Sequence, residues 1–409
     1  MNNKKIRSWS DKRVVALVLL LDALLIGAFL CVFALFHHVL PRNFHQRQLD
    51  PGKYEDLPDF GWDDDTDTDT DTDTDTDTDT DTDTDTDTDT DTDTDTDTDT
   101  DDDDPPVEPK QPTREEQIEA FKATVMANKR YQDSPLGERE FNEIGVYYED
   151  NARIYAYSTS FGEDDDKVTY YVADVFVSNL SELRTHVCLN KKGAVTDGII
   201  TDVVDEENAV LCINGDYFKS RNQGTYIRNG MLYLDLSTTS DICLLYLDGT
   251  MECINGDGFE SDDAIDRGVW QVWTFGPSLF DEDGMPITKN KYFNISGSYI
   301  VNRDSKSGLY GFQNDQPRTA IGYVSPGHYM LVVVDGRAKG YSKGVTLVEL
   351  AQLMYDEGCT LAYNLDGGGS SMFWFDGELR NCKSDDIISG RKPSDYIFIS
   401  YSDKKEGEQ

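Results

Sequence analysis

Short apolar runs separated by turn signals dominate the chain from Gly145 onward. Runs of this length, rich in Val, Ile, Tyr and Phe and bounded by Asn-Gly, Asp-Gly or Ser-Pro-Gly, are typical of β-strands. The clearest are VTYYVADVFV, AVLCINGDYF, DICLLYLDG, WTFGPSLF, RTAIGYV, HYMLVVVDGR and DYIFISYS. The pattern therefore predicts a domain built mainly from β-sheet.

Two stretches have helical spacing instead. The first follows Thr113 and places Glu116 three residues on, which is the capping-box arrangement that starts a helix. The second repeats this arrangement with Thr346 and Glu349, and Gly358 is placed to end it. Each has its apolar positions on one face: Ile118, Phe121, Val125 and Met126 in the first, and Leu347, Leu350, Leu353 and Met354 in the second. We expect an α+β fold, a strand-rich mixed sheet domain with a few packed helices.

An apolar segment near the N-terminus predicts a membrane anchor. The residues from Val14 to Phe36 carry one charge, that of Asp22, and are enough to cross a bilayer as a helix. Basic residues are more frequent before the segment than after it, which places the N-terminus in the cytoplasm. A cleaved signal peptide is the alternative, but the apolar region is long for one and no A-x-A site follows it. We expect a single-pass signal-anchor at residues 14–38 and an extracytoplasmic domain at the cell membrane.

A tract of only Asp and Thr follows. Between Asp63 and Asp104 it contains 24 Asp and 18 Thr, and subtracting those 24 charges from the formal net charge of −42 leaves about −18. Because it has no apolar residue, the tract is predicted to be a disordered, low-complexity spacer. Calcium accumulation and glycosylation of the threonines are the alternatives. The rest of the chain has no basic stripe, which argues against nucleic acid as a partner.

These features predict six parts of the chain. They are a cytoplasmic stub (1–13), the transmembrane anchor (14–38), the disordered acidic Asp-Thr linker (39–112), a helical lead-in (113–140), the main domain (141–402) and a tail (403–409). Only the lead-in and the main domain combine apolar residues with the periodicity of a packed core.

Six of the seven cysteines lie in the predicted main domain, and sequence alone cannot choose their pairing. The segment CLLYLDGTMEC has the pattern of a β-hairpin, and the length of its loop decides whether one disulfide pair is possible. A three-residue loop from Leu247 to Gly249 would place Cys243 opposite Cys253, whereas a two-residue loop would place Leu244 there. Both registers stay open. No C-x-x-C spacing occurs, so nothing indicates a zinc site.

Three consecutive glycines lie between a carboxylate and two hydroxyls in YNLDGGGSSMFWFDG. A phosphate cradle would need a following helix and usually a lysine, but strand-like MFWF follows and no lysine is near. A nucleophilic serine has little support, because His186 and His328 are the only histidines outside the N-terminal region. The pattern favours a loop whose bare backbone approaches a ligand closely, with Asp366 and the serines making polar contacts. A tight strand crossing with a capping Asp is the alternative.

Several segments, taken together, resemble the phosphodiester glycosidase family, including its bacterial exopolysaccharide-related members. They follow the family's order over roughly residues 140–402, and a G-x-T-L-x-E-L-A helix precedes the last of them. The segments are INGDYF (213–218), YIRNGMLY (226–233), FGPSLF (275–280), QPRTAIGY (316–323), HYMLVVVDGR (328–337) and NLDGGGSS (364–371).

This resemblance implies hydrolysis of a sugar joined through its anomeric carbon to a phosphodiester, which frees the sugar and leaves a phosphate monoester. Such cleavage passes through an oxocarbenium-like state that carboxylates usually serve. The predicted catalytic residues are therefore Asp366, Asp335 and Asp216. Asp216 comes third because many members of the family have Gly at this position. A hairpin turn at Asp335-Gly336 is the alternative explanation for Asp335.

A charged diester is expected to be held by a planar guanidinium, for which Arg318 and Arg337 are the candidates. A structural ion pair for Arg318 and an Asn-Gly turn for Asn214 are the alternatives, and capping alone explains Glu349. Hard carboxylate oxygens would suit Ca²⁺ or Mg²⁺, but no residue pattern requires a metal. The predicted substrate-binding residues are Asn214, Arg318, Thr319, Arg337, Gly367, Gly368, Gly369, Ser370 and Ser371.

The sequence thus predicts a membrane-tethered hydrolase, a phosphodiester glycosidase acting on glycan-phosphate structures of an envelope or exopolysaccharide, with no required cofactor. A non-catalytic glycan-binding protein on the same scaffold is the first alternative. A surface spacer whose role lies in the acidic tract is the second. Release of free sugar from a sugar-1-phosphodiester distinguishes the predicted enzyme from the binding protein.

Overall fold

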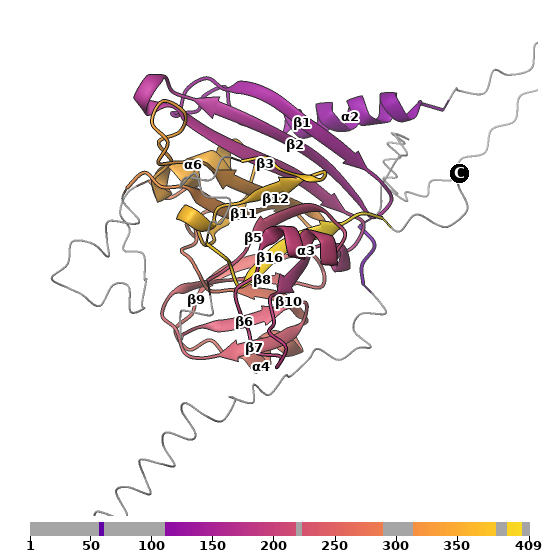
Figure 1. Ribbon diagram of the computed structural model, residues 1–409, viewed down its shortest axis with the longest axis vertical. Coiled ribbons are helices and arrows are strands. Elements are labelled where there is room, and N and C mark those ends of the chain that lie inside the picture. Colours follow the sequence, from indigo (N-terminus) through magenta and orange to yellow (C-terminus); the bar gives the residue numbers. More distant parts are fainter. Residues whose placement is uncertain (1–56, 61–110, 218–222, 289–313, 382–390, 403–409) are drawn as a thin grey trace, which may run out of the picture.

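A computed structural model describes residues 57–60, 111–217, 223–288, 314–381 and 391–402. Figure 1 shows three β-sheets stacked along the long axis of the molecule, with few helices. Within the described residues every pairing between named strands is antiparallel. The predicted strand-rich α+β character is confirmed, whereas the predicted mixed sheet is wrong. Strands that follow each other and pair do so as hairpins, which makes them antiparallel, whereas parallel pairs would need a crossover connection.

The largest sheet has six strands and is buried on both faces. Tyr171 and Ala173 contribute to the hydrophobic core on one face, while Tyr170 and Val172 contribute to the core on the other. This double burial explains the nearly continuous apolar runs in the sequence. In sheet order the strands are β1 (Glu140–Tyr148), β2 (Ala152–Phe161), β3 (Val168–Val177), β12 (His328–Val334), β11 (Arg318–Ser325) and β13 (Leu361–Asn364).

Two five-stranded sheets share the larger core with the inner face of the six-stranded sheet. Val333, Ile213 and Trp273, one from each sheet, belong to this core. The middle sheet consists of β15 (Glu378–Leu379), β14 (Phe373–Phe375), β5 (Ala209–Asn214), β16 (Asp395–Ser400) and β4 (Arg184–Val187). The lower sheet in Figure 1 consists of β7 (Met231–Asp235), β6 (Thr225–Arg228), β10 (Val269–Trp273), β8 (Asp241–Tyr246) and β9 (Met251–Asn255).

Both predicted helices are confirmed and pack on the outer face of the six-stranded sheet. They are α2 (Arg114–Ala127) and α6 (Leu347–Asp356), and each begins with the predicted capping box. Phe121 and Val125 of α2 and the predicted apolar face of α6 are buried in the second core. The smaller helical elements are α3 (Ile200–Glu206), α4 (Ser261–Asp266), η3 (Asp164–Asp166), η4 (Leu180–Glu182) and η6 (Gly368–Ser370).

Buried charges bind the segment after α2 to the sheet. The Lys129 ammonium lies 2.7 Å from Asp174 Oδ2 of β3 and 3.3 Å from Glu357 Oε2 at the end of α6. His328 Nε2 lies 2.6 Å from the other Asp174 oxygen. Because buried charges are stable only when they are paired, these contacts fix the lead-in against β3 and β12. The predicted domain boundary at residue 140 stays a prediction.

The β8–β9 hairpin has the predicted three-residue loop. Gly249 adopts a φ of 81°, and Cys243 lies directly opposite Cys253 in the ladder. Both cysteines are free thiols, as are Cys188, Cys212 and Cys359. The register that would allow this bridge is therefore confirmed, and the bridge itself is not formed in the structure.

Four residues of the predicted linker, 57–60, are described. The Phe60 backbone N–H donates to the Ser178 carbonyl oxygen at 2.7 Å. The Phe60 side chain packs against Gly249 and Gly327. A Cβ atom on either glycine would lie within 3 Å of it, so both positions require a residue without a side chain. This short segment thus contacts the turns of two hairpins. The Asp-Thr tract between Asp63 and Asp104 lies outside the described residues.

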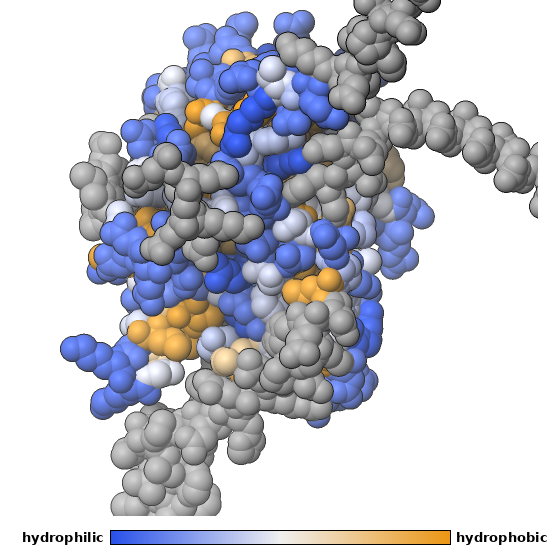
Figure 2. Space-filling view, turned by 90° about the vertical axis from the view of Figure 1, so that its right-hand side faces the viewer, coloured by the Kyte–Doolittle hydropathy of each residue, from blue (hydrophilic) through white to orange (hydrophobic). Residues whose placement is uncertain are grey.

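The predicted localisation is contradicted. Of the helices in the described ranges, none has both the length and the apolar content to cross a membrane. The predicted single-pass anchor at residues 14–38, with a cytoplasmic N-terminus and an extracytoplasmic domain, lies outside the described residues. Figure 2 shows one face of the molecule, where hydrophilic side chains predominate and apolar ones gather in small separate patches, as is normal for a folded domain.

Candidate functional site

The antiparallel order of the strands brings the predicted site residues together at one edge of the six-stranded sheet. Strand β11 begins at Arg318 where β12 and β13 end, since Arg318 pairs with Val334 and Ala320 pairs with Asn364. The end of β5 joins this edge, because the Asp366 backbone N–H donates to the Gly215 carbonyl oxygen. Residues separated by 152 positions in the sequence thus meet at the glycine loop, defined here as residues 365–372.

The glycines are needed because the loop lies very close to other parts of the chain. A Cβ atom at Gly367 would lie 2.8 Å from the Pro317 carbonyl oxygen. Gly368 has a φ of 67°, and a Cβ atom there would lie 3.1 Å from Arg337 Nη2. Side chains at these positions would be strained or would collide. The glycines therefore allow the start of β11 and a guanidinium to approach the loop closely, and the predicted approach of a ligand stays a prediction.

Internal hydrogen bonds hold the glycine loop against β5 and β11. The Asn214 side chain donates to the Asp366 carbonyl oxygen at 2.6 Å and accepts from the Met372 backbone N–H at 3.1 Å. Thr319 Oγ1 donates to Asn214 Oδ1 at 2.8 Å and lies 3.4 Å from Ser371 Oγ. Asn214 and Thr319 are fully buried. These hydrogen bonds make them positioning residues for the loop, and their predicted contact with a ligand stays a prediction.

One predicted catalytic carboxylate, Asp366, lies in the loop, and another, Asp335, lies beside it. Asp366 is 4% exposed, and its Oδ1 accepts from the Gly367 backbone N–H at 3.0 Å. Asp335 is 2% exposed, and its two oxygens accept from Asn381 Nδ2 and the Tyr341 hydroxyl, each at 3.0 Å. Burial and the charge of Asp335 raise the pKa of Tyr341, which keeps this phenol protonated as a donor.

The environment of Asp335 excludes the hairpin-turn alternative. Strand β12 is followed by the connection to α6 and not by a partner strand, so Asp335-Gly336 joins no hairpin. Asn381 Nδ2 also donates to the Ser371 carbonyl oxygen at 3.1 Å. Asn381 thereby connects Asp335 to the end of the glycine loop through hydrogen bonds. Neither Asn381 nor Tyr341 was predicted as a site residue.

Two arginines lie beside the glycine loop: a Cβ atom at Gly367 would lie 3.4 Å from the Arg318 Cα, and one at Gly368 would lie 3.1 Å from Arg337 Nη2. Arg318 is 6% exposed, and it donates to the carbonyl oxygens of Val345 and Asn314, each at 3.1 Å. Burial, and after it the charge of Arg337, lower the pKa of Arg318 to about 10, so it stays protonated at neutral pH. Arg337 is exposed, and its Nε donates to Gln316 Oε1 at 2.8 Å. The loop edge therefore carries charged groups of both signs, and the charges of Asp315 and Glu349 also act on Arg318, opposing the effect of Arg337.

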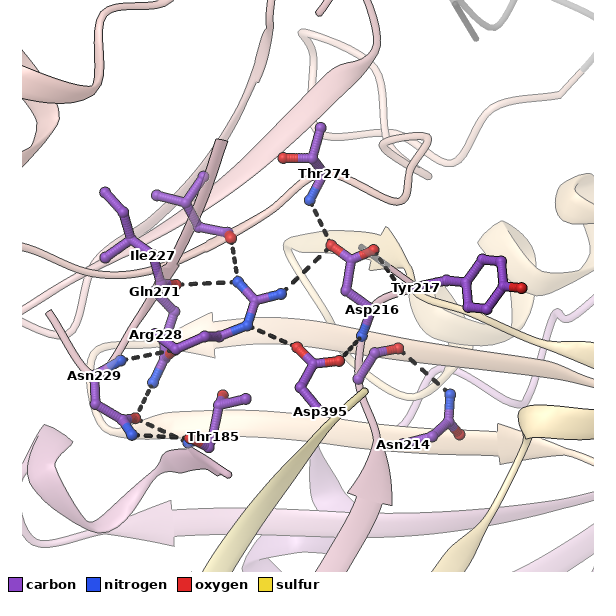
Figure 3. A network of polar contacts seen from close by, with 12 residues as sticks. Thr185, Asn214, Asp216, Tyr217, Ile227, Arg228, Asn229, Gln271, Thr274 and Asp395 are labelled. Carbon is purple, nitrogen blue, oxygen red and sulfur yellow. Dashed lines mark hydrogen bonds and ion pairs between the residues drawn. The ribbon is translucent and has the colours of Figure 1, made fainter. Parts of the chain in front are cut away.

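The third predicted carboxylate, Asp216, lies in a separate buried cluster (Figure 3). Arg228 Nε lies 2.7 Å from Asp395 Oδ2, and Arg228 Nη2 lies 3.5 Å from Asp216 Oδ2. The Asp216 backbone N–H donates to Asp395 Oδ1 at 2.8 Å, and the Thr274 N–H donates to Asp216 Oδ2 at 2.8 Å. All three charged side chains have no exposed surface. Asp216 therefore has structural partners on several sides, and its predicted catalytic role stays a prediction.

The cluster predicts a pH effect on stability. Burial raises the pKa of Asp395 to about 7, with the charge of Arg228 opposing this shift and that of Asp216 adding to it. The unfolded value is about 3.9. A folded-state pKa above the unfolded one means that the folded state binds the proton more tightly, so stability from this group falls as the pH rises from about 4 to 7.

Asp395→Asn is expected to remove this dependence. Between pH 5 and pH 7 the wild type should lose about 2 kcal/mol of unfolding free energy relative to the variant. Urea unfolding of both proteins at the two pH values measures the difference. Parallel pH dependence of the two proteins would show that Asp395 does not hold a proton in this range.

The described residues hold no group of three or more His, Cys, Asp or Glu side chains that could bind a metal ion. The carboxylates of Asp366, Asp335 and Asp216 make their contacts with backbone, amide, phenol and guanidinium groups, as described above. The predicted Ca²⁺ or Mg²⁺ thus receives no support from the arrangement of these residues.

Comparisons with known proteins show what this chain is similar to. The sequence model of the phosphodiester glycosidase family matches residues 207–400, a range that contains the glycine loop. The chain is 29% identical over 218 residues to the SPbeta prophage-derived uncharacterized protein YomE of Bacillus subtilis, covering 52% of this chain and 31% of that protein. It is 38% identical over 68 residues to the N-acetylglucosamine-1-phosphodiester alpha-N-acetylglucosaminidase of Bos taurus, covering 17% of this chain and 12% of that protein.

The fold is also similar to a solved structure, the catalytic domain of zebrafish N-acetylglucosamine-1-phosphodiester alpha-N-acetylglucosaminidase. The TM-score is 0.50 at 18% identity, over 66% of this chain and 92% of that one. The chain spans less than a third of the length of either curated relative described above. As the order of its motifs predicted, the chain contains, over residues 207–400, a domain of the phosphodiester glycosidase family.

Proposed function

We propose that this domain hydrolyses a sugar joined through its anomeric carbon to a phosphodiester. The observation that carries the proposal is a pair of arginines beside the loop that bears Asp366: Arg337, whose guanidinium borders Gly368, and Arg318, whose backbone borders Gly367 and whose charge interacts with that of Arg337. Like charges held near each other are costly, and the charge of Arg337 contributes to the lowered pKa of Arg318. A bound anion would offset this cost, and a phosphodiester matches the two-pronged geometry of a guanidinium.

Each charged group then has a role in the reaction. The guanidiniums hold the phosphate, and the carboxylate of Asp366 faces the anomeric carbon. The bond between that carbon and the phosphate oxygen breaks, and its electron pair leaves with the phosphate monoester. Water supplies the new hydroxyl group on the sugar and releases its proton to the solvent. The negative charge of Asp366 stabilises the oxocarbenium-like state, and the phosphate is a good leaving group without a separate acid.

Asp335 is the proposed second carboxylate. Hydrogen bonds from Asn381 and Tyr341 hold its side chain in place, so its carboxylate would add negative potential without moving. Among the described residues Ser370 Oγ has no hydrogen-bond partner although Ser370 is buried, which leaves it as a polar contact for the ligand. Gly367, Gly368 and Gly369 are partly exposed, so the ligand would reach the loop at its backbone.

The names of the mammalian relatives support N-acetylglucosamine as the first sugar to test. Glycan-phosphate structures, as in exopolysaccharides, are the proposed natural substrates. The test incubates the chain with the methyl ester of N-acetylglucosamine-1-phosphate and measures free N-acetylglucosamine by chromatography. Release of the sugar with formation of methyl phosphate is expected. Binding of the ester without release would contradict hydrolysis and favour the glycan-binding alternative.

A further inference from the structure

Two free thiols face each other in the hairpin of β8 and β9. Cys243 of β8 and Cys253 of β9 are direct ladder partners, so their side chains point to the same face of the sheet. Among the cysteines in the described ranges, only these two are partners in a ladder. They are called the cysteine pair below. The hairpin thus holds two oxidisable groups side by side.

The position of the cysteine pair in the ladder suits a disulfide bond. At the turn the Tyr246 backbone N–H donates to the Thr250 carbonyl oxygen, and at the other end the Gly256 N–H donates to the Ser240 carbonyl oxygen, each at 2.9 Å. Hydrogen-bonded and non-hydrogen-bonded pairs alternate along an antiparallel ladder, so counting from either end makes the cysteine pair non-hydrogen-bonded. The Cα atoms of such a pair lie about 4.5 Å apart, within the range of about 4.4–6.8 Å that disulfides span. The two sulfur atoms can therefore bond with little movement of the backbone.

The two thiols differ in their access to solvent. Cys243 is fully buried in the larger hydrophobic core, and burial raises the pKa of its thiol. Cys253 is partly exposed on β9, the edge strand of its sheet, and lines a groove of about 590 Å³. Because the thiolate is the form that reacts, a small oxidant meets Cys253 first. Cys243 can react only with what is already bound to its partner.

We propose that the cysteine pair is a site of reversible oxidation, at which a small-molecule disulfide such as oxidised glutathione converts the two thiols into a disulfide bond. This inference is independent of the proposed function, because it concerns the state of the thiols and not the hydrolysis of a sugar ester. The bond would join the edge strand β9 to β8. It would also fasten the hairpin that supports β13, since the Asp241 carbonyl oxygen accepts from the Tyr363 hydroxyl at 2.7 Å.

The reaction has two exchange steps. The Cys253 thiolate attacks one sulfur of the oxidised glutathione, which forms a mixed disulfide and releases one molecule of reduced glutathione. Cys243, held beside Cys253 by the ladder, then attacks the Cys253 sulfur and releases the second molecule. The cysteine pair loses two electrons and two protons in total, and the oxidant gains them. Excess reduced glutathione drives the same exchange backwards.

Peptide mapping of the native chain tests the proposal. The chain is incubated with oxidised glutathione, the remaining thiols are blocked, and an endoprotease that cuts before aspartate is added without a reductant. This enzyme cuts before Asp248 and so separates the peptides 241–247 and 248–256, which carry one cysteine each. Mass spectrometry is expected to find these two peptides joined, and to find them separate after treatment with excess reduced glutathione.

Oxidation is also expected to raise the melting temperature by about 5 °C or more relative to the reduced chain. A bond between the strands removes conformational freedom from the unfolded chain, which stabilises the folded state. Thermal melts of the oxidised and reduced chains measure the shift. A melting temperature that falls on oxidation would mean that the bond distorts the hairpin, and would contradict a ladder geometry suited to it.

Three variants separate the roles of the two thiols. In Cys243→Ala the reaction should stop at the mixed disulfide, so Cys253 should carry one glutathione. In Cys253→Ser the buried Cys243 should remain unmodified. Cys359→Ala is the matched control, because Cys359 is also fully buried but has no cysteine as a ladder partner. Its peptides 241–247 and 248–256 should be joined as in the wild type.

The map of the wild type decides the outcome even where a variant fails to fold in a thermal melt. Joined peptides that appear under native conditions and open with reduced glutathione would support the proposal. Thiols of the cysteine pair that stay free, a glutathione on Cys253 of the wild type that is never displaced, or joined peptides that form only after unfolding in urea would each overturn it.

Discussion

Asp366→Asn is expected to lower kcat for a sugar-1-phosphodiester by about 10²–10⁴-fold, the usual contribution of a positioned carboxyl group to catalysis. The change removes the negative charge that would stabilise the oxocarbenium-like state. It keeps the size of the side chain and an oxygen that can accept from the Gly367 backbone N–H, a bond of 3.0 Å in the wild type. The fold should therefore be spared, and steady-state release of the free sugar measures the effect.

The matched control for this change is Asp376→Asn. Asp376 also precedes a glycine, but it is exposed in the turn between β14 and β15 and contacts Tyr401 instead of the glycine loop. Its variant should keep wild-type kcat. The melting temperature of Asp366→Asn should stay at or above that of the wild type, because a buried charge is replaced by a neutral amide. Wild-type turnover in Asp366→Asn would show that this carboxylate only shapes the loop.

Arg337→Lys is expected to lower kcat/KM by roughly 30-fold or more. This corresponds to about 2 kcal/mol, which is at the lower end of the cost of losing a charged, hydrogen-bonded partner. A lysine ammonium keeps the charge but cannot make two parallel hydrogen bonds to one phosphate. Arg337 suits this test better than Arg318, since Arg318 is buried and holds two backbone carbonyl groups. Initial rates over a range of substrate concentrations give the value.

Lys339 provides a control of equal charge for a second variant, Arg337→Ala. It lies two positions later, is 85% exposed and pairs with Asp165. Arg337→Ala and Lys339→Ala remove the same net charge, so a general electrostatic effect would appear in both. Only Arg337→Ala should lose activity and weaken inhibition by the product methyl phosphate. Equal losses in the two variants would argue against a phosphate contact by Arg337.

Local sequence signals gave most of the secondary structure. The capping boxes at Thr113 and Thr346 determine where α2 and α6 begin, because each satisfies backbone donors within four residues. Gly249 similarly determines the three-residue turn that places Cys243 opposite Cys253. The pairing of distant strands had no such signal. Nothing local indicates that β3 pairs with β12, more than 150 residues later, so the predicted mixed sheet was wrong.

The candidate site was predicted only in part, because the sequence marks local motifs but not the contacts between distant segments. Asp366, Asp335, Arg318 and Arg337 lie in motifs that could be recognised, and the fold brings them to one edge. Asn381 and Tyr341 were missed because an isolated Asn and Tyr have no spacing that marks them as partners of Asp335. Their roles depend on contacts between the glycine loop, the α6 connection and β12, which only the folded chain shows.

Asp216 and Asn214 show that a motif does not reveal the partners of its polar side chains. Both belong to the INGDYF motif, and a polar motif beside a strand is equally consistent with ligand contact and with internal bonding. The partners of Asp216, Arg228 and Asp395, come from β6 and from the start of β16. Gly215 is required there as well, because a Cβ atom would lie 2.9 Å from the Asp395 carboxyl carbon. The motif therefore builds a buried junction between two sheets.

The most direct measurement of the central claim identifies the bond that breaks. Hydrolysis of methyl N-acetylglucosamine-1-phosphate in water enriched in ¹⁸O, followed by mass spectrometry of the methyl phosphate, distinguishes the two bonds to the bridging oxygen. Attack at the anomeric carbon predicts methyl phosphate without ¹⁸O, because the water oxygen stays on the sugar. Methyl phosphate or sugar phosphate that contains ¹⁸O would mean attack at phosphorus, and would contradict a glycosidase site at the glycine loop.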